Sequence, residues 1–580
     1  MREFFKLRSN FLKAFLALAM TVIVAKLFSI QIIEHDKYVA QAEAQHTMQN
    51  TIVAKRGEIY VMDGDNPVPM VMNSKAWSII IDPQITRKQR EKVEKVLTEK
   101  AQEYVTVKNF DNVYKDTISR YLVVAKNVPY KNAQEIKKQD LPGVYFQGAN
   151  KRVYPEGKMA AGLLGFVNQN GDGQYGVEQA LNKELAGTNG VLKTVKDVNN
   201  IPLTIGDENV RVPAKDGTNV VLSIDRNIQN KAEQILAEKT KEYKISHGTM
   251  MVMDPMNGRI MAVASVPNYD PENYGKVKDA EVFQTNATMD AYEAASVCKA
   301  FAFAAAIDLQ KMTPETTFYN SDQTIVDGWP INNAWKGHIG TLTMQQALTW
   351  SLNTGSTQAL RLLGDSETEI TRVGKERLYD YYYNKFWLGK YTGIEIAESA
   401  GIIVAPNKVD ATNARYANMT FGQGLNVTGI QLITAFSSLV NRGEYFKPTV
   451  VGGEMVNGEY KAREYAPADH TTVSVATSKT MREMLVKTRA AYSSALQADQ
   501  GFYVGGKTGT AQAIRDGKYV MDETIATYLG FGAKNRDSDP QYVILTKFWE
   551  KNRNLTGDYH AMPAFNEMSK YMLEYLKMKE

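Results

Sequence analysis

Ala294-Ala-Ser-Val-Cys-Lys-Ala-Phe-Ala-Phe-Ala-Ala-Ala-Ile307 joins a hydroxyl and an amine to a long apolar run. The run over residues 300–307 predicts a buried helix, because it has no polar face. Ser296 and Lys299 are three positions apart, which places both side chains on one face of that helix. A lysine that is deprived of water can act as the base that turns a serine hydroxyl into a nucleophile. Backbone N–H groups at a helix start also lie where an oxyanion would develop.

A serine and a lysine at this spacing arise by chance about once or twice in such a chain, so a capping serine beside a solvated lysine is the alternative. Two further patterns favour a catalytic role for Ser296 and Lys299 over this alternative. Ser351-Leu-Asn353 offers a hydroxyl for proton relay and a carboxamide for a peptide amide, although alone it reads as a turn. Lys507-Thr-Gly-Thr510 offers a cation, two hydroxyls and a glycine beside which a substrate strand can lie, although alone it reads as a charged edge strand. Each pattern occurs once, which favours a single acyl-transfer site.

The composition excludes several classes of protein. The 580 residues are 44% hydrophobic and 23% charged, which is typical of a multidomain globular protein. A net charge of +4 is too balanced for nucleic-acid binding. One cysteine, Cys298, excludes an internal disulfide or thiolate cluster, and the six histidines lack metal-ligand spacing, so we expect neither metal nor cofactor. Cys298 should face the core and not act as a thiol nucleophile.

The N-terminal segment predicts a membrane anchor. Residues 14–33 are apolar apart from Lys26, and 20 residues suffice for a helix to cross about 30 Å of hydrocarbon. The four basic residues before the span place residues 1–13 in the cytoplasm and the rest of the chain outside, as a single-pass protein of the cell membrane. The alternatives are a cleaved signal peptide and a buried amphipathic helix.

Residues 34–215 read as a separate N-terminal domain. Residues 41–49 are polar and compatible with a helix, and residues 51–60 read as extended chain around a glycine turn. Residues 85–137 show helical spacing with many Lys and Glu, which indicates surface helices. Residues 151–190 are turn-rich.

Residues 216–580 read as one large α+β domain. The expected elements are a strand at 220–225, a helix at 228–241, a hairpin of 249–253 with 259–264, strands at 502–504, 526–530 and 542–546, and a closing helix at 563–578. Strands at both ends bracket a helical middle, so we expect the first and last strands to share a sheet.

The three motifs, in this order, resemble those of the penicillin-binding protein and serine β-lactamase superfamily. The chain looks most like the class B penicillin-binding proteins, which are monofunctional peptidoglycan transpeptidases with one anchor. The likeness extends over most of the chain and includes Arg56-Gly57, Leu141-Pro-Gly-Val144, Arg152-x-Tyr154-Pro155, Tyr292-Glu293, Gly422-Gln-Gly424 and residues 557–565. It implies an antiparallel sheet covered by helices, carried on an elongated, dimerisation-like pedestal.

The resemblance also implies roles for the motif residues. Ser296 would be the acylated nucleophile and Lys299 its general base. Ser351 would relay a proton, and Asn353 would donate to the peptide amide of the substrate. The backbone N–H groups of Ser296 and Thr510 would form the oxyanion hole.

The third motif would bind the end of the substrate. Lys507, Thr508, Gly509 and Thr510 resemble the subsite for the terminal carboxylate of a D-Ala-D-Ala stem peptide. Ser296 would then release D-alanine, a neighbouring stem's amine would take the acyl group, and β-lactams would be trapped on the serine. Hydrolysis of the acyl group would give a carboxypeptidase side activity.

Residues 160–168, Ala-Ala-Gly-Leu-Leu-Gly-Phe-Val-Asn, look more like the septal than the elongation branch. The family implies a SEDS-class glycan polymerase and other division proteins as partners. A class A protein is disfavoured because no glycosyltransferase signature is present, and a β-lactamase because of the anchor and the long insertion. An elongation transpeptidase and a non-enzymatic β-lactam sensor or division scaffold remain alternatives.

Two departures from the family pattern stand out. Ala294-Ala295 replaces the usual Pro-Gly before the nucleophile, which alters the backbone freedom of that turn. Residues 61–65, Val-Met-Asp-Gly-Asp, replace the common Asp-Arg-Asn-Gly continuation near the membrane. We interpret Arg56 and Glu58 as structural or partner-contacting residues.

Overall fold

The computed structural model describes residues 2–38, 47–115, 119–195, 210–499, 501–515 and 518–577. The chain forms two compact units. One comprises Met1–Lys55 with Gly187–Gly217, and the other comprises Arg56–Ala186 with Thr218–Glu580. The predicted division at residue 216 between pedestal and transpeptidase domain stays a prediction.

The smaller unit contains the N-terminal helix and a three-stranded antiparallel sheet. Helix α1 (Arg2–Phe28) continues into the π-helical turn η1 (Ser29–Ile33), and Leu7–Ile33 is long and apolar enough to cross a membrane. The sheet has the order β1 (Thr47–Ile52), β8 (Gly190–Val195) and β9 (Val210–Val212). Residues 41–46 of the expected 41–49 helix lie outside the described residues, and from Thr47 that expectation is wrong because the backbone pairs with β8.

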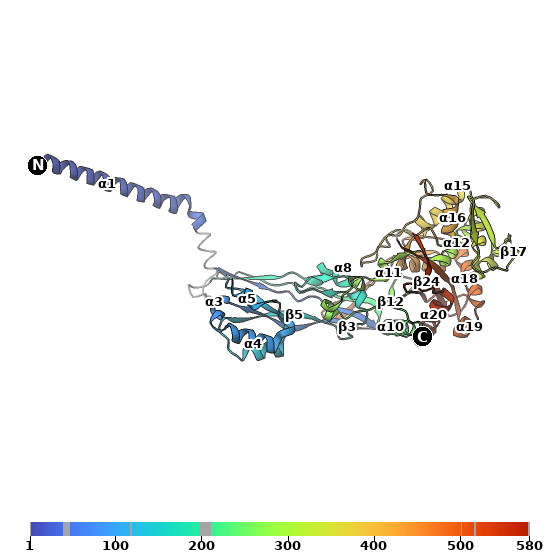
Figure 1. Cartoon of the computed structure of the whole chain (residues 1–580), viewed down its shortest axis with the longest axis horizontal. Helices are drawn as coiled ribbons and strands as arrows, with labels where there is room; N and C mark the ends of the chain where they lie inside the picture. The colour runs from blue at the N-terminus through green and yellow to red at the C-terminus, as the bar shows by residue number, and fades with distance from the viewer. Residues whose placement is uncertain are drawn as a thin grey trace. The chain divides into compact units, whose positions relative to one another are not determined.

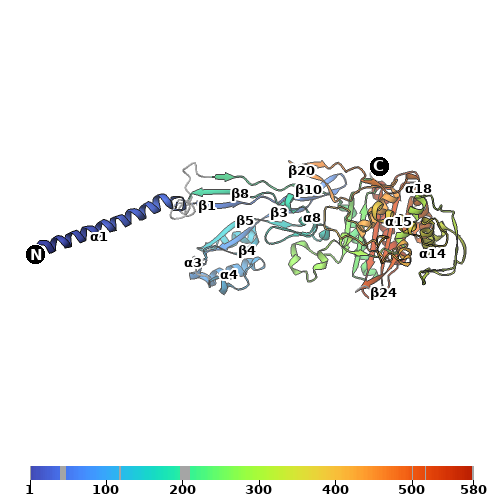
Figure 2. The same cartoon turned by 90° about the horizontal axis from the view of Figure 1, so that it is seen from above.

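The larger unit contains a seven-stranded sheet that we call the pedestal sheet. Its strands are β2 (Ile59–Asp63), β3 (Asn66–Ile81), β4 (Leu122–Pro129), β5 (Val144–Val153), β10 (Asn219–Asp225), β20 (Val451–Val456) and β21 (Glu459–Ala462). The order is β21-β20-β10-β2-β3-β4, and β5 pairs with β3. Figure 2 shows orange β20 beside β10, so residues far apart in the sequence close this sheet.

The location of β10 corrects one prediction. The strand expected at 220–225 does form, but it does not share a sheet with the C-terminal strands. It pairs in parallel with β2 and antiparallel with β20, and residues 220–225 are buried. A strand that is buried along its length has the pattern of a central strand, and the pedestal sheet supplies both of its neighbours.

Short helices cover part of the pedestal sheet. They are α3 (Pro83–Thr86), α4 (Arg90–Ala101), α5 (Phe110–Val113) and α6 (Tyr130–Lys137), which confirms helices in the 85–137 region. Strand β4 within that region was missed, although its Leu-Val-Val-Ala run is typical of a strand. The turn-rich stretch holds only short elements: α7 (Ala161–Leu164), β6 (Phe166–Val167), β7 (Gly173–Gln174), α8 (Gly176–Ala180) and α9 (Asn182–Ala186).

A second sheet carries the third motif. Its five antiparallel strands follow the order β12 (Ile260–Val266), β11 (His247–Met253), β25 (Tyr542–Trp549), β24 (Lys518–Ala533) and β23 (Tyr503–Arg515). The predicted hairpin and the three C-terminal strands therefore do share a sheet. Helices α10 (Arg226–Tyr243) and α20 (Met562–Lys577) pack with this sheet in one apolar cluster, while α12 (Lys299–Asp308) and α17 (Gly429–Val440) belong to another. Figure 1 labels β24 near α12 and α20.

The helical middle lies between β12 and β23 in sequence. It contains α11 (Asn286–Met289), η6 (Ala295–Cys298), α13 (Met344–Thr349), α14 (Asn353–Leu363), α15 (Arg372–Tyr379), α16 (Asn413–Thr420), α18 (Val475–Ala490) and α19 (Ser493–Asp499). Two small hairpin-like pairs join β14 (Thr317–Asn320) with β17 (Gly340–Thr343), and β15 (Gln323–Val326) with β16 (Trp329–Asn332). The α+β architecture is as expected.

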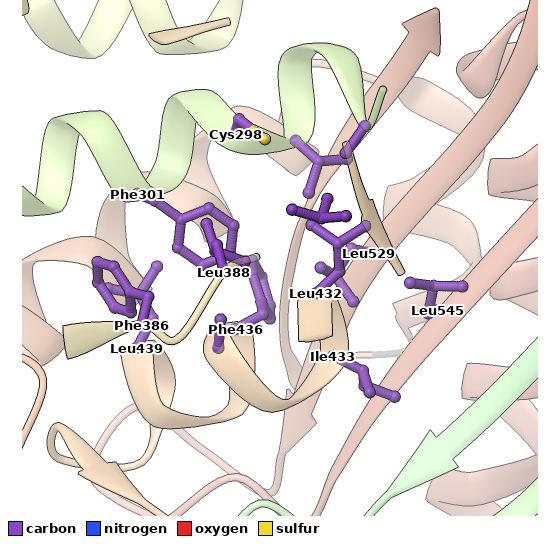
Figure 3. Packing of buried hydrophobic residues seen from close by; sticks show 14 of the residues in the cluster. Cys298, Phe301, Phe386, Leu388, Leu432, Ile433, Phe436, Leu439, Leu529 and Leu545 are labelled. Carbon is purple, nitrogen blue, oxygen red and sulfur yellow. The ribbon is translucent and has the colours of Figure 1, made fainter. Parts of the chain in front are cut away.

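Helix α12 runs through the centre of the core. Figure 3 shows Cys298 at its start and Phe301 one turn on, above Phe386 and Phe436. Cys298 is fully buried, and the rings of Phe301 and Phe386 lie 5.0 Å apart between centroids. Burial raises the pKa of the Cys298 thiol well above its usual range, so the predicted core role of this cysteine is confirmed and a thiolate nucleophile is disfavoured.

Candidate active site

The first motif forms a tight turn at the start of α12. Ser296 is partly exposed, whereas Ala295, Val297 and Lys299 around it are buried. Ala295 has a φ of +48°, in the left-handed region that favours glycine. Its N–H donates to the carbonyl oxygen of Gly422 at 3.1 Å, and a Cβ at Gly422 would lie only 2.1 Å from the Ala295 carbonyl oxygen. The turn that presents the hydroxyl is therefore braced by a segment more than a hundred residues away.

Three side chains from the three motifs form a hydrogen-bonded chain. Lys299 Nζ donates to the carbonyl oxygen of Ser351 at 2.5 Å and to its hydroxyl at 3.1 Å. Lys507 Nζ donates to the same hydroxyl at 2.9 Å and to Thr508 Oγ1 at 3.3 Å. Ser351 has a φ of +55°, which places its hydroxyl between the two amines. The predicted proximity of the three motifs is present in this geometry.

Burial changes the acidity of both amines. Lys299 is fully buried, and burial, followed by the charge of Lys507, lowers its pKa well below the usual range. Burial also lowers the pKa of Lys507 to about 7, although the charge of Asp558 opposes that shift. No carboxylate among the described residues forms an ion pair with either amine. Lys507 can therefore hold or release a proton near neutral pH, and Lys299 gives up its proton more readily than an exposed lysine does, as a general base must.

The hydroxyl of Ser296 has no hydrogen bond to Lys299 within the described part of the chain; the amine contacts Ser351 instead. Such bonds commonly tighten only when substrate is bound. The direct pairing of Ser296 with Lys299 that the spacing suggests stays a prediction.

The second motif is held by a polar network that the three sequence motifs do not predict. Asn353 begins α14, and its side-chain amide donates to the carbonyl oxygen of Asn332 on β16 at 2.8 Å. The next residue, Thr354, donates from its N–H to Asn333 Oδ1 and from its hydroxyl to Asn320 Oδ1. These buried amides orient the start of α14, and only their three-dimensional arrangement reveals them.

The third motif lies on β23 directly beside the nucleophile turn. A Cβ at Gly509 would lie 2.7 Å from the carbonyl oxygen of Ala294, so the glycine permits this close approach. Thr510 is exposed, and its hydroxyl accepts from the N–H of Gly557 at 3.0 Å. Thr508 is partly exposed. Two hydroxyls thus line the accessible part of this strand, next to the buried amine of Lys507.

Several supporting groups lay beyond sequence reasoning. Gly422 and Gly557 were part of matched segments but had no assigned role, and both prove to be points of close backbone approach. Glu293 lies buried three residues before Ser296, again without an assigned role. Among the described residues, no three His, Cys, Asp or Glu side chains gather as ligands of a metal ion would.

Sequence comparison defines the class of protein. Residues 248–570 match the family described as penicillin-binding protein transpeptidase domain, and residues 51–222 match the penicillin-binding protein dimerisation domain. The chain belongs to the penicillin-binding proteins, and the order of its domains is that of the class B transpeptidases. The predicted fold and family are confirmed.

Individual relatives refine this placement. The chain is 29% identical to stage V sporulation protein D of Bacillus subtilis (strain 168) over 93% of this chain and 80% of that protein. It is 24% identical to peptidoglycan D,D-transpeptidase FtsI of Buchnera aphidicola over 100% of this chain and 96% of that protein. A crystal structure titled penicillin-binding protein 3 from Mycobacterium tuberculosis, complexed with aztreonam, aligns with a TM-score of 0.66 at 22% identity, over 91% of this chain and 97% of that one. This last likeness supports the fold.

Proposed function

We propose that the chain cross-links peptidoglycan through an acyl-enzyme on Ser296. The observation that carries this proposal is the chain from Lys299 through Ser351 to Lys507, since it joins two amines of lowered pKa beside a partly exposed serine. Neutral Lys299 takes the proton of Ser296 as its Oγ attacks the carbonyl carbon of the penultimate D-alanine. The N–H groups of Ser296 and Thr510 stabilise the oxyanion.

The tetrahedral intermediate then collapses. The bond between the carbonyl carbon and the nitrogen of the terminal D-alanine breaks, and that nitrogen receives the proton by way of Ser351. In the second step the amine of a neighbouring stem attacks the ester carbon. The ester C–O bond breaks, the proton returns to Ser296 Oγ, and a new peptide bond links the two stems. Water in place of the amine would give the carboxypeptidase side reaction.

Substrate orientation is assigned to the other motif residues. Lys507 in its charged form, with the hydroxyls of Thr508 and Thr510, binds the terminal carboxylate, because these groups line one strand. Gly509 keeps that strand free of a side chain opposite the nucleophile turn. Asn353 donates its amide to the substrate backbone.

The cellular setting follows from the anchor and from the relatives. The apolar span of α1 and η1 would hold the protein in the cell membrane, with residues 1–13 in the cytoplasm and the catalytic domain outside. The name of the FtsI relative and the residue 160–168 segment favour septal wall synthesis over elongation. A SEDS-class polymerase and other division proteins are the proposed partners.

Covalent labelling tests the site assignment. Full-length protein in detergent should label with a fluorescent penicillin, and Ser296→Ala should abolish labelling while circular dichroism and thermal unfolding stay as in the wild type. Labelling that persists in a folded Ser296→Ala protein contradicts the assignment. Release of D-alanine from a stem peptide, with cross-linked product when an amine acceptor is added, distinguishes an enzyme from a β-lactam sensor.

A further inference from the structure

A cleft of about 530 Å³ adjoins the third motif on the side away from Lys507. Its lining includes residues 512–515, which begin two residues after Thr510 on β23. It also includes Tyr292 and Glu293, which precede the nucleophile turn. Residues 504–507 of β23 are buried, so a peptide whose carboxylate sits at Thr508 and Thr510 can extend only toward 512–515. Extended chain rises about 3.3 Å per residue, which places the residue before D-Ala-D-Ala near Gln512.

The lining of the cleft has an excess of negative charge. It contains five carboxylate residues, one lysine and one arginine. Both cations form ion pairs within the lining: Lys547 pairs with Asp290, and Arg515 pairs with Glu523. The other three carboxylates, Asp279, Glu281 and Glu293, form no ion pair with any described residue.

Glu293 is the buried member of these three, with an exposed fraction of 4%. Its Oε1 accepts from the N–H of Gly424 at 2.7 Å and from the hydroxyl of Tyr519 at 3.0 Å. Its Oε2 is buried without a hydrogen-bond partner among the described residues. The nearby Arg415 is engaged by Asp410 and by the carbonyl oxygen of Gly424. A buried carboxylate oxygen that lacks a donor is costly, and Glu293 is one of the residues that line the cleft.

We propose that this cleft binds the primary ammonium group of a stem-peptide side chain, and that Glu293 Oε2 accepts one of its N–H bonds. The proposal rests on the acyl-enzyme site at Ser296 argued above. The ammonium can come from two sources: the side chain of the donor residue that precedes D-Ala-D-Ala, or the acceptor amine before it attacks the ester. Glu293 is then a substrate-recognition residue for the cross-linking reaction.

The first experiment uses the wild-type protein and needs no variant to fold. D-Alanine release is measured for donor peptides that carry lysine, Nε-acetyl-lysine or norleucine before D-Ala-D-Ala. Cross-link formation is measured against the concentration of an amine acceptor. If the donor is the source, lysine exceeds both neutral side chains in kcat/KM by about tenfold, as a hydrogen bond to a buried charge provides.

The second experiment compares Glu293→Gln with Glu281→Gln, which removes an exposed carboxylate from the same lining. Glu293→Gln should abolish the lysine preference if the donor is bound, or raise the acceptor KM about tenfold with unchanged acylation if the acceptor is bound. Glu281→Gln should retain most of the wild-type preference. Equal effects of the two variants, or no ammonium dependence in the wild type, overturn the proposal. Labelling that persists in Ser296→Ala overturns instead the acyl-enzyme site on which it rests.

Discussion

The pedestal and the active site both bury cations, but they do so in opposite ways. In the pedestal, Glu178 is fully buried between Arg56 and Arg152 and accepts from both guanidinium groups at 2.8 Å. In the active site, Lys299 and Lys507 share the hydroxyl of Ser351 and have no carboxylate partner among the described residues. A paired buried charge stays charged and holds structure, whereas an unpaired buried amine releases its proton readily and becomes reactive. The presence of a carboxylate partner therefore distinguishes the structural cations of the pedestal from the reactive amines of the active site.

Removal of the active-site amine should have the largest effect. Lys299→Met removes the proposed base but keeps a side chain of similar length, so acylation by fluorescent penicillin should fall about 1,000-fold. Because an uncompensated buried amine is removed, the thermal unfolding temperature should not decrease. Lys551→Met, at an exposed position, is the control. Acylation within tenfold of the wild-type rate would exclude Lys299 as the base.

Removal of the pedestal counter-ion should act on stability alone. Glu178→Gln leaves two buried guanidinium groups without an anion and should lower the free energy of unfolding by about 3 kcal/mol. Urea unfolding, with hydrogen exchange on β2 and α8, measures this change. Asp111→Asn breaks the exposed ion pair with Arg90 and should cost at most about 1 kcal/mol. A tenfold loss of penicillin acylation in folded Glu178→Gln would contradict the separation between the two regions.

The sequence predicted the parts of this comparison unequally. The three motifs, the anchor and most elements of the large domain could be predicted, because each depends on local spacing or periodicity. Arg56 was interpreted as a structural or partner-contacting residue. Its contact with Glu178 could not be deduced from the sequence, because the two residues are 122 positions apart. The prediction that β10 shares a sheet with the C-terminal strands was wrong for the same reason, because its partners are far away in the sequence. A strand shows by its pattern that it is buried, while the sheet it joins depends on β2 and β20.

The lowered pKa of the two lysines was anticipated only for Lys299. The alanine-rich run after it predicts a dry helix, and the structure buries the amine as expected. Lys507 was interpreted as a cation for the substrate carboxylate, whereas burial brings its pKa to about 7. Desolvation is a property of the assembled site, so no spacing in the sequence reports it.

The pKa of Lys507 makes the active site sensitive to pH near neutrality. If charged Lys507 binds the substrate carboxylate, kcat/KM for D-alanine release should fall about tenfold per pH unit above pH 7. Lys507→Arg keeps the charge, so its profile should lose this decline near pH 7. An identical decline in Lys507→Arg would assign it to another group.

The same shift has a defined effect on stability. The unfolded chain binds a proton at Lys507 up to about pH 10.4, and the folded chain releases it near pH 7. Between these values the unfolded state holds more protons, so the free energy of unfolding rises with pH. Lys507→Met should reduce this slope. An unchanged slope in that variant would show that Lys507 does not titrate in the folded state.

The smallest expected effect is on stability, and it comes from two alanines with left-handed backbone conformation, one in each region. Ala295 before the nucleophile and Ala160 in the 151–190 stretch are both buried alanines in the left-handed conformation, with φ values of +48° and +54°. A non-glycine residue there costs about 1–2 kcal/mol, which exceeds the entropy that glycine loses on folding. Both Ala295→Gly and Ala160→Gly should therefore raise the free energy of unfolding, by about 0.5 kcal/mol.

Activity distinguishes these two positions. Ala160 lies at the start of α7, where its N–H donates to Glu233, so its replacement should leave penicillin acylation unchanged. Ala295 fixes the direction of the turn that presents Ser296, and a more flexible glycine should slow acylation by about two- to threefold even as the protein becomes more stable. Acylation rates and thermal unfolding of the two variants, measured together, test this. Equal acylation in both would mean that the strained alanine contributes nothing to the position of the nucleophile.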